Sequence, residues 1–188
     1  MIQKLHEMLA QYTPWNEQEK RDRQMILSHL LDPMIFTREN HAMHFTASAW
    51  ITDPSREKVL MAYHNIYHSW AWTGGHADGD EDLLAVALRE AEEETGAQAI
   101  PLSPDIFSLE VLTVDGHEKR GEYVPSHLHL NITYLLEADP NKKIRIKADE
   151  NAGVQWFYLD EALEKCSEEW MKERIYKKLN AKLRAFGR

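Results

Sequence analysis

The sequence predicts a layered α/β domain with a mixed sheet, and three features of the 188-residue chain support this fold class. Apolar residues recur at helical spacing near both ends, whereas the middle of the chain alternates apolar and polar residues as strands do. Glycine and proline number only eight and seven, which excludes a collagen-like or low-complexity chain. Helices that flank a set of strands pack as layers around one core, so a helical bundle is not expected.

Residues 1–40 are expected to form a helical arm, and residues 41–188 the main domain with its C-terminal helix. Asn16 followed by Glu19 resembles a capping pair at the start of a helix. Apolar residues then recur at spacings of three and four until Asp32, where a proline follows. The arm is therefore expected to contain at least one amphipathic helix.

Residues 44–51 alternate apolar and polar side chains and predict the first strand. A turn that contains a proline leads to a second strand at 59–64, so the two strands are expected to form a hairpin. A short strand at 70–72 precedes two glycines. Residues 80–95 then predict a helix that Gly96 closes.

The clearest strand is expected at residues 127–136, where apolar residues occupy the even positions and His127 and His129 begin a polar set at the odd positions. Because successive side chains of a strand point to opposite faces, we expect one face in the core and the other lining a wet cavity. A last strand at 154–158 precedes one or two closing helices. The basic residues of these helices are expected on the solvent face: Lys172, Arg174, Lys177, Lys178 and Lys182.

Charge and cysteine content limit the function classes. Lysines and arginines total 22 against 31 aspartates and glutamates, and the net charge of −9 argues against a protein that coats nucleic acid or an anionic membrane. Cys166 is the single cysteine, so an intrachain disulfide and a cysteine-built zinc site are excluded. We find no membrane-spanning run and no secretion leader, and therefore expect a cytoplasmic protein that acts on a small molecule.

Three carboxylates identify the segment that carries chemistry. Glu90, Glu93 and Glu94 span about 100° of the expected helix and share one face. Like charges at this spacing call for a cation, and oxygen ligands suit Mg²⁺ or Mn²⁺. Arg89 beside them can orient a carboxylate or hold a phosphate through paired hydrogen bonds. Considered alone, the run also fits a solvated helix face.

The surrounding segment, residues 75–97, decides between these interpretations. It reads GHADGDEDLLAVALREAEEETGA and fits the pattern Gly-x5-Glu-x7-Arg-Glu-U-x-Glu-Glu-x-Gly-U, in which U is hydrophobic. A chance match to its seven fixed positions in a chain of this length is rarer than about one in a million. The chain therefore resembles the Nudix hydrolase family, and the weaker resemblance extends over roughly residues 41–164.

The resemblance implies an α/β/α sandwich with a mixed sheet, here with an N-terminal helical extension. It also implies hydrolysis of the diphosphate linkage in a nucleoside diphosphate derivative with Mg²⁺ or Mn²⁺. Carried over by position, Glu90, Glu93 and Glu94 look like the metal-binding and catalytic carboxylates. Arg89 looks like the orienting residue, and Gly75 like the backbone that approaches metal and phosphate.

A further family glutamate lies six positions before a tryptophan of a late strand, and Glu150 stands in this relation to Trp156. Its alternative interpretation is an ordinary loop carboxylate. In diphosphate hydrolysis the divalent ion lowers the pKa of a bound water, and a glutamate takes the proton of that water. Glu90, Glu93 and Glu150 are the candidates for this base, and we expect Glu150 to bind metal as well.

Histidines are the remaining candidates for substrate binding. His64, His76, His127 and His129 form part of a pattern that resembles a bacterial Nudix subgroup with a helical arm. His127 and His129 share the polar face of one strand. They are expected either to contact phosphate or ribose or to add metal ligands. Surface histidines without a role are the alternative.

Two other functions occur on this fold. Isopentenyl diphosphate isomerases resemble Nudix proteins and need a cysteine at the substrate, but the only cysteine here, Cys166, lies in a closing helix. A non-catalytic nucleotide-binding module is expected to lack a motif glutamate, and this chain lacks none. The sequence leaves the leaving group open, and also the choice between monomer and homodimer.

Overall fold

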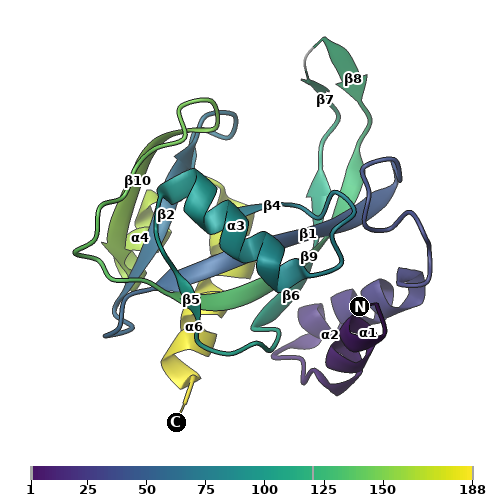
Figure 1. Ribbon diagram of the computed structural model, residues 1–188, viewed down its shortest axis with the longest axis horizontal. Coiled ribbons are helices and arrows are strands. Elements are labelled where there is room, and N and C mark those ends of the chain that lie inside the picture. Colours follow the sequence, from purple (N-terminus) through teal and green to yellow (C-terminus); the bar gives the residue numbers. More distant parts are fainter. Residues whose placement is uncertain (1, 120, 188) are drawn as a thin grey trace.

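The fold is an α/β arrangement that a computed structural model describes for residues 2–119 and 121–187. In chain order the elements are α1 (Ile2–Gln11), α2 (Glu17–His29), β1 (Met43–Thr52), β2 (Lys58–His64), β3 (Ser69–Ala71), β4 (Thr73–His76), α3 (Leu83–Thr95), β5 (Ile100–Pro101), β6 (Ser108–Val114), β7 (His117–Lys119), β8 (Glu122–Val124), β9 (His127–Glu137), β10 (Asn151–Tyr158), α4 (Leu159–Lys165), α5 (Glu169–Met171), the π-helical segment η1 (Lys172–Tyr176) and α6 (Lys177–Ala185). Figure 1 shows the sheet crossed by α3, with the β7–β8 hairpin projecting from one end.

Strand β1 lies at the centre of a mixed sheet whose main order is β10-β2-β1-β9-β5. One edge of β1 pairs in parallel with β9 from Met43 opposite Leu128 to Thr52 opposite Glu137. The other edge pairs antiparallel with β4 and then with β2. The expected hairpin and the mixed sheet are therefore confirmed.

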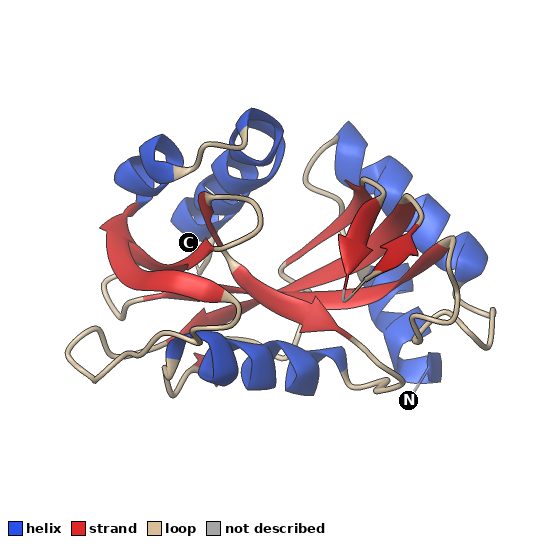
Figure 2. Ribbon diagram, turned by 90° about the horizontal axis from the view of Figure 1, so that it is seen from above, coloured by secondary structure: helices blue, strands red, loops and turns tan. Residues whose placement is uncertain are grey.

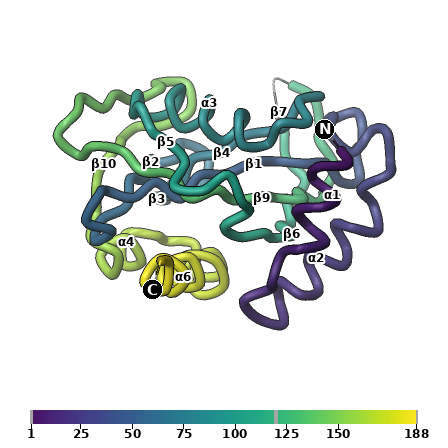
Figure 3. Tube along the Cα trace, turned by 60° about the horizontal axis from the view of Figure 1, so that its bottom comes forward, coloured from purple at the N-terminus to yellow at the C-terminus, as the bar shows by residue number. Residues whose placement is uncertain are grey.

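Helices cover both faces of the sheet, so the molecule has α/β/α layers (Figure 2). Helix α3 lies on one face, α4 and α6 lie on the other, and α1 and α2 pack at one end (Figure 3). The core on the α3 side includes Phe45, Ile132 and Val86, and residues of α1 and α2 join it. The core on the α6 side includes Trp50 and Leu179. Within the described residues, no helix is both long enough and apolar enough to cross a membrane.

The polar face of β9 is buried over most of its length, so the expectation of a wet cavity is wrong there. Asn131 and Thr133 are only 1% and 0% exposed. The hydroxyls of Thr46 and Ser48 each donate to Asn131 Oδ1 over 2.9 Å, and the Asn131 amide donates to Glu110. Because these groups satisfy one another, a polar strand face can be buried without solvent.

A buried ionic network continues from this polar face and ties both ends of the chain to the sheet. Lys178 Nζ lies 2.9 Å from Glu110 and 3.2 Å from Glu19, and Lys182 Nζ lies 2.8 Å from Glu19. Both glutamates are fully buried. The expected solvent position is therefore wrong for Lys178 and Lys182, since their ammonium groups are drawn inward by buried carboxylates.

The start of α2 has one of the two reciprocal hydrogen bonds of a capping pair. Asn16 Oδ1 accepts from the Glu19 N–H over 2.9 Å, as expected. The Glu19 carboxylate turns inward instead of returning to Asn16, and it accepts from the Tyr12 hydroxyl and the Trp15 N–H. The ionic partners explain this choice, because two ammonium groups bind a carboxylate more strongly than one backbone N–H does.

The charge state of Glu19 follows from this network. Burial alone would raise the pKa of Glu19, but the ammonium groups of Lys178 and Lys182 outweigh it and lower the pKa to about 2. A glutamate with a depressed pKa stabilises the fold above its usual pKa near 4.5. This contribution is lost as pH falls from about 4.5 toward 2.

Replacing Lys178 by methionine is expected to lower the free energy of unfolding by about 3–5 kcal/mol, because it leaves two buried carboxylates undercompensated. The matched control is Lys177→Met, which removes an exposed pair with Glu173 and should cost about 0–1 kcal/mol. Urea denaturation at neutral pH measures both. Equal, small losses in the two variants would show that the network does not stabilise the fold.

Candidate active site

Helix α3 carries the motif glutamates and is fixed to the sheet by its opposite, apolar side. Leu83, Val86 and Ala87 are buried beneath it. The helix begins at Leu83 and not at residue 80 as expected, because the Asp82 side chain caps it by accepting from the Ala85 N–H over 3.1 Å. It ends as expected at Gly96, whose φ of 69° is left-handed.

Glu90 packs directly against the backbone of β4. A Cβ atom on Gly75 would lie 2.7 Å from both Glu90 carboxylate oxygens, so only glycine leaves this carboxylate its place. The Glu90 side chain is 17% exposed. Burial and the nearby Glu93 raise the pKa of Glu90, while Arg89 and Lys147 oppose the rise.

Glu94 is the most deeply placed of the three motif glutamates. It is 6% exposed, and its Oε1 accepts from the Gly74 N–H over 2.9 Å. Burial raises its pKa to about 8, although the Gly74 N–H opposes this shift and Glu90 adds to it. A cation beside this carboxyl would favour its ionised form.

Glu93 and Glu150 come together through a lysine that the sequence analysis missed. Lys147 Nζ lies 3.2 Å from Glu93 Oε2 and 2.9 Å from Glu150 Oε1. Burial opposes the charge of Lys147, but the two carboxylates outweigh burial and raise its pKa. The spacing of three residues between Lys147 and Glu150 could have indicated this ion pair from the sequence. The sequence around Lys147 does not indicate that Glu93 lies beside them.

The loop that carries Glu150 is fastened to the end of α3. The Asn151 side-chain amide donates to the Glu94 carbonyl over 2.9 Å, and the Glu150 N–H donates to the Lys147 carbonyl over 2.8 Å. Burial is the main cause that raises the pKa of Glu90 and of Glu94, and the nearby Glu150 charge adds to both shifts. Glu90, Glu93, Glu94 and Glu150, which come from two distant segments, therefore lie near one another, and we call them the carboxylate region.

The donor set of this region fits a hard divalent ion. Carboxylate oxygens are preferred ligands of Mg²⁺ and Mn²⁺. The Lys147 ammonium, which lies between two of the carboxylates, demonstrates that the region accommodates positive charge. Arg89 lies beside it as expected, with Nε 3.9 Å from Glu90 and a terminal nitrogen 3.4 Å from Asp80.

A second polar group consists of histidines at the adjoining ends of β1, β4 and β9. The His44 ring lies 5.2 Å from His76, 4.9 Å from His127 and 5.1 Å from His129, measured between ring centroids. Burial and the neighbouring imidazoles lower the pKa of His129 to about 2. Three of the four predicted histidines, His76, His127 and His129, therefore lie together. His44 joins them, although its position in a buried strand did not indicate a functional role.

His64 lies apart from this group. It ends β2, and its Nδ1 accepts from the Ile66 N–H over 3.2 Å and the Tyr67 N–H over 3.4 Å. Burial lowers its pKa, and Glu150 opposes that shift. These hydrogen bonds stabilise the turn that follows β2, near the Glu150 loop.

The two polar groups lie on opposite faces of the sheet. Gly75 faces α3, since its added Cβ would meet Glu90, whereas an added Cβ on Gly74 would meet Ser48. Side chains alternate along a strand, so His76 points to the same face as Gly74, away from α3. Strand β4 therefore contributes to the carboxylate region through Gly75 and to the histidine group through His76.

A NUDIX domain model matches residues 42–179, which is more than half of the chain. The chain belongs to the Nudix family. It is 30% identical over 118 residues to the bis(5'-nucleosyl)-tetraphosphatase (asymmetrical) of Rattus norvegicus, an alignment that covers 62% of this chain and 74% of that relative.

Solved structures of Nudix hydrolases share the fold. A Nudix hydrolase from Nitrosomonas europaea superposes with a TM-score of 0.54 at 19% identity, over 75% of this chain and 88% of that one. An Ap4A hydrolase from C. elegans gives a TM-score of 0.52 at 19% identity, over 76% and 98% of the two chains. The family prediction and the α/β/α architecture of this Nudix hydrolase are therefore confirmed.

Gly75→Ala is expected to fold but to lose most of its hydrolase activity, because the added methyl group displaces the flexible Glu90 carboxylate. Gly74→Ala should instead unfold at a lower temperature, because its Cβ would lie 2.7 Å from the rigid Ala47 carbonyl oxygen. Thermal unfolding and steady-state turnover of both variants separate the two effects. Full turnover in Gly75→Ala would show that the position of Glu90 is not critical.

Proposed function

We propose that this Nudix hydrolase cleaves the diphosphate linkage of a nucleoside diphosphate derivative and requires Mg²⁺ or Mn²⁺. The observation that carries the proposal is the carboxylate region formed by Glu90, Glu93 and Glu94 of α3 with Glu150 from the loop before β10. Such a region attracts divalent ions and would repel a diphosphate without them. A cation is therefore needed before an anionic substrate can bind.

The motif residues and Glu150 have different roles in the proposed hydrolysis. A bound divalent ion would neutralise diphosphate oxygens and lower the pKa of the attacking water. Glu90, Glu93, Glu94 and Glu150 would supply oxygen ligands to it, and Gly75 leaves Glu90 room beside the backbone. Glu90, Glu93 and Glu150 are the candidates to accept the water's proton. Arg89 orients Glu90 from the exposed side of the helix.

Dinucleoside polyphosphates are the first substrates to examine. The rat relative is named a bis(5'-nucleosyl)-tetraphosphatase, and this substrate class contains the diphosphate linkages that the proposed chemistry requires. We infer that His76, His127 and His129 take no part in activating the attacking water. Their location on the sheet face opposite α3 supports this inference.

The isomerase alternative is disfavoured by the position of the only cysteine. Cys166 is 3% exposed and packs in the core on the α6 side, far along the chain and across the sheet from α3. Burial raises the pKa of its thiol, although Ser69 opposes the shift. A buried, protonated thiol does not act on a substrate bound at the carboxylates.

Glu93→Gln is expected to lower turnover by at least about 100-fold while the protein remains folded, because an amide keeps the shape but loses the ligand charge. The matched control is Glu92→Gln, which neutralises an exposed neighbour on a different side of the helix. Both are assayed with a panel of dinucleoside polyphosphates, nucleotide sugars and oxidised nucleotides. Equal turnover in Glu93→Gln and wild type would refute the role of Glu93.

Mg²⁺ is expected to raise the melting temperature, since an ion that binds only the folded state adds about 2.7 kcal/mol at a hundredfold excess over its Kd. The double variant Glu90→Gln with Glu94→Gln should lose most of this gain. Differential scanning calorimetry with and without Mg²⁺ measures the shift. If the double variant gains as much as wild type, the ion binds elsewhere, and a non-catalytic function becomes the better account.

A further inference from the structure

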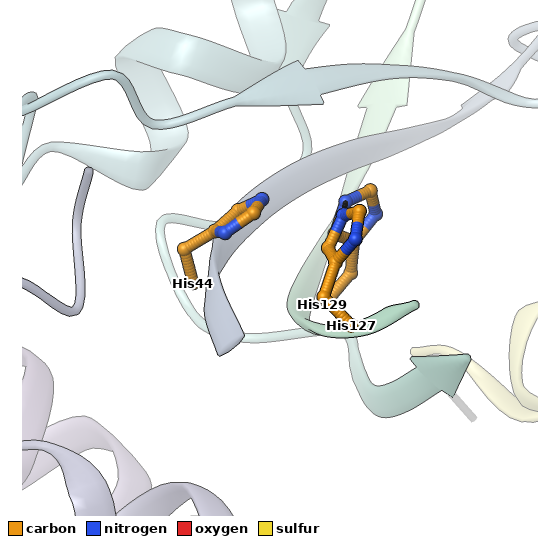
Figure 4. A group of neighbouring side chains, drawn as sticks. All are labelled: His44, His127 and His129. Carbon is orange, nitrogen blue, oxygen red and sulfur yellow. Dashed lines mark hydrogen bonds between the residues drawn. The ribbon is translucent and has the colours of Figure 1, made fainter. Parts of the chain in front are cut away.

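Three histidine rings from two strands converge on one another (Figure 4). They lie on the sheet face opposite α3. His44 comes from β1, and His127 and His129 come from β9. One ring nitrogen from each residue lies within 4.8 Å of those of the other two. We propose that these imidazoles form a binding site for a transition-metal ion of the Zn²⁺ type, separate from the carboxylate region.

Hydrogen bonds at Nδ1 of His44 and His127 leave the Nε2 atom of each ring free to bind a metal ion. His44 Nδ1 lies 3.0 Å from the Asn40 carbonyl oxygen, and His127 Nδ1 lies 2.9 Å from the Pro125 carbonyl oxygen. A carbonyl only accepts, so each Nδ1 must carry the proton, and each neutral ring presents a lone pair on Nε2. Metal-binding histidines are commonly oriented by this kind of bond.

The surroundings of the Nε2 atoms suit a bound ion better than a hydrogen-bond network. His44 Nε2 is buried and has no hydrogen-bond partner among the described residues. His127 Nε2 lies 3.2 Å from His129 Nε2. Two ligand nitrogens of a tetrahedral ion with bonds of about 2.0 Å are separated by about 3.3 Å. The His127–His129 pair already has this spacing.

The backbone register holds this arrangement. His44 is directly opposite His129 in the parallel β1–β9 ladder, and His127 and His129 point to one face because they are two residues apart. His44 and His127 are 4% and 8% exposed, so their rings have little freedom. Ligands that are fixed before binding cost less to order when the ion arrives.

The ligand type distinguishes this site from the carboxylate region. Imidazole nitrogens favour Zn²⁺, Co²⁺, Ni²⁺ and Cu²⁺, whereas Mg²⁺ prefers oxygen. Three protein ligands leave a fourth position for water or an anionic group, as in sites where zinc binds a reactant. Direct contact of the histidines with a phosphate is the competing interpretation, and it requires no metal.

The first test titrates metal-free wild-type protein with Zn²⁺ in the presence of excess Mg²⁺, which occupies carboxylates and leaves imidazoles available. Calorimetry should detect one equivalent of Zn²⁺. His127→Ala and His44→Ala should weaken Zn²⁺ binding by more than about 10–100-fold. That range is the loss seen when a residue that only hydrogen-bonds to a metal ligand is removed. His41→Ala, an exposed histidine near β1, is the matched control and should bind like wild type.

The second test uses the wild-type protein alone and therefore does not depend on how the variants fold. Co²⁺ replaces Zn²⁺, and X-ray absorption counts the imidazoles around it; three are expected. Absence of Zn²⁺ binding, Co²⁺ coordinated by oxygen only, or unchanged affinity in folded His127→Ala would each overturn the proposal. None of these readouts requires turnover, so failure of the proposed hydrolysis would leave the result interpretable.

Discussion

The parallel pairing of β1 with β9 is the constraint on which the rest of the structure depends. Because the ladder extends along all of β1, it fixes which residues of two distant segments lie side by side, including His44 opposite His129 and Thr46 opposite Asn131. With that edge occupied, β4 must pair with the other edge. This second pairing brings Gly75 beneath α3. The carboxylate region and the histidine group therefore both follow from the position of one strand.

Lysine ammonium groups compensate carboxylates in two different settings in this protein. Glu19 and Glu110 receive lysine ammonium groups that are themselves buried, and such pairs stay closed because separating them exposes uncompensated charge. Glu93 and Glu150 share the ammonium of Lys147, and both carboxylates are partly exposed. Solvent and ions can compete for that second group. This difference in burial separates Glu19 and Glu110, which support the fold, from Glu93 and Glu150, whose lysine partner solvent and ions can replace.

The features that the sequence predicted are local, and those it missed depend on long-range contacts. The motif glutamates lie on one helix, so their spacing alone places Glu90 with its neighbours. Lys178 has the spacing of a solvent-exposed helix residue, yet partners from α2 and β6 draw it inward. His44 became part of a cluster only through the β1–β9 register. The start of α3 is a local exception: it was expected three residues too early, because Asp82 caps the helix directly before Leu83.

The central claim is that the glutamates of α3 hold the divalent ion that the hydrolysis requires. Crystals of the wild-type protein grown with Mn²⁺ and a non-hydrolysable diphosphate analogue test it most directly, through the anomalous scattering of manganese. We expect an anomalous peak bonded to carboxylate oxygens of Glu90, Glu93 or Glu94, with Lys147 displaced from between Glu93 and Glu150. Manganese found only away from these carboxylates, with Lys147 still in place beside bound analogue, would contradict it.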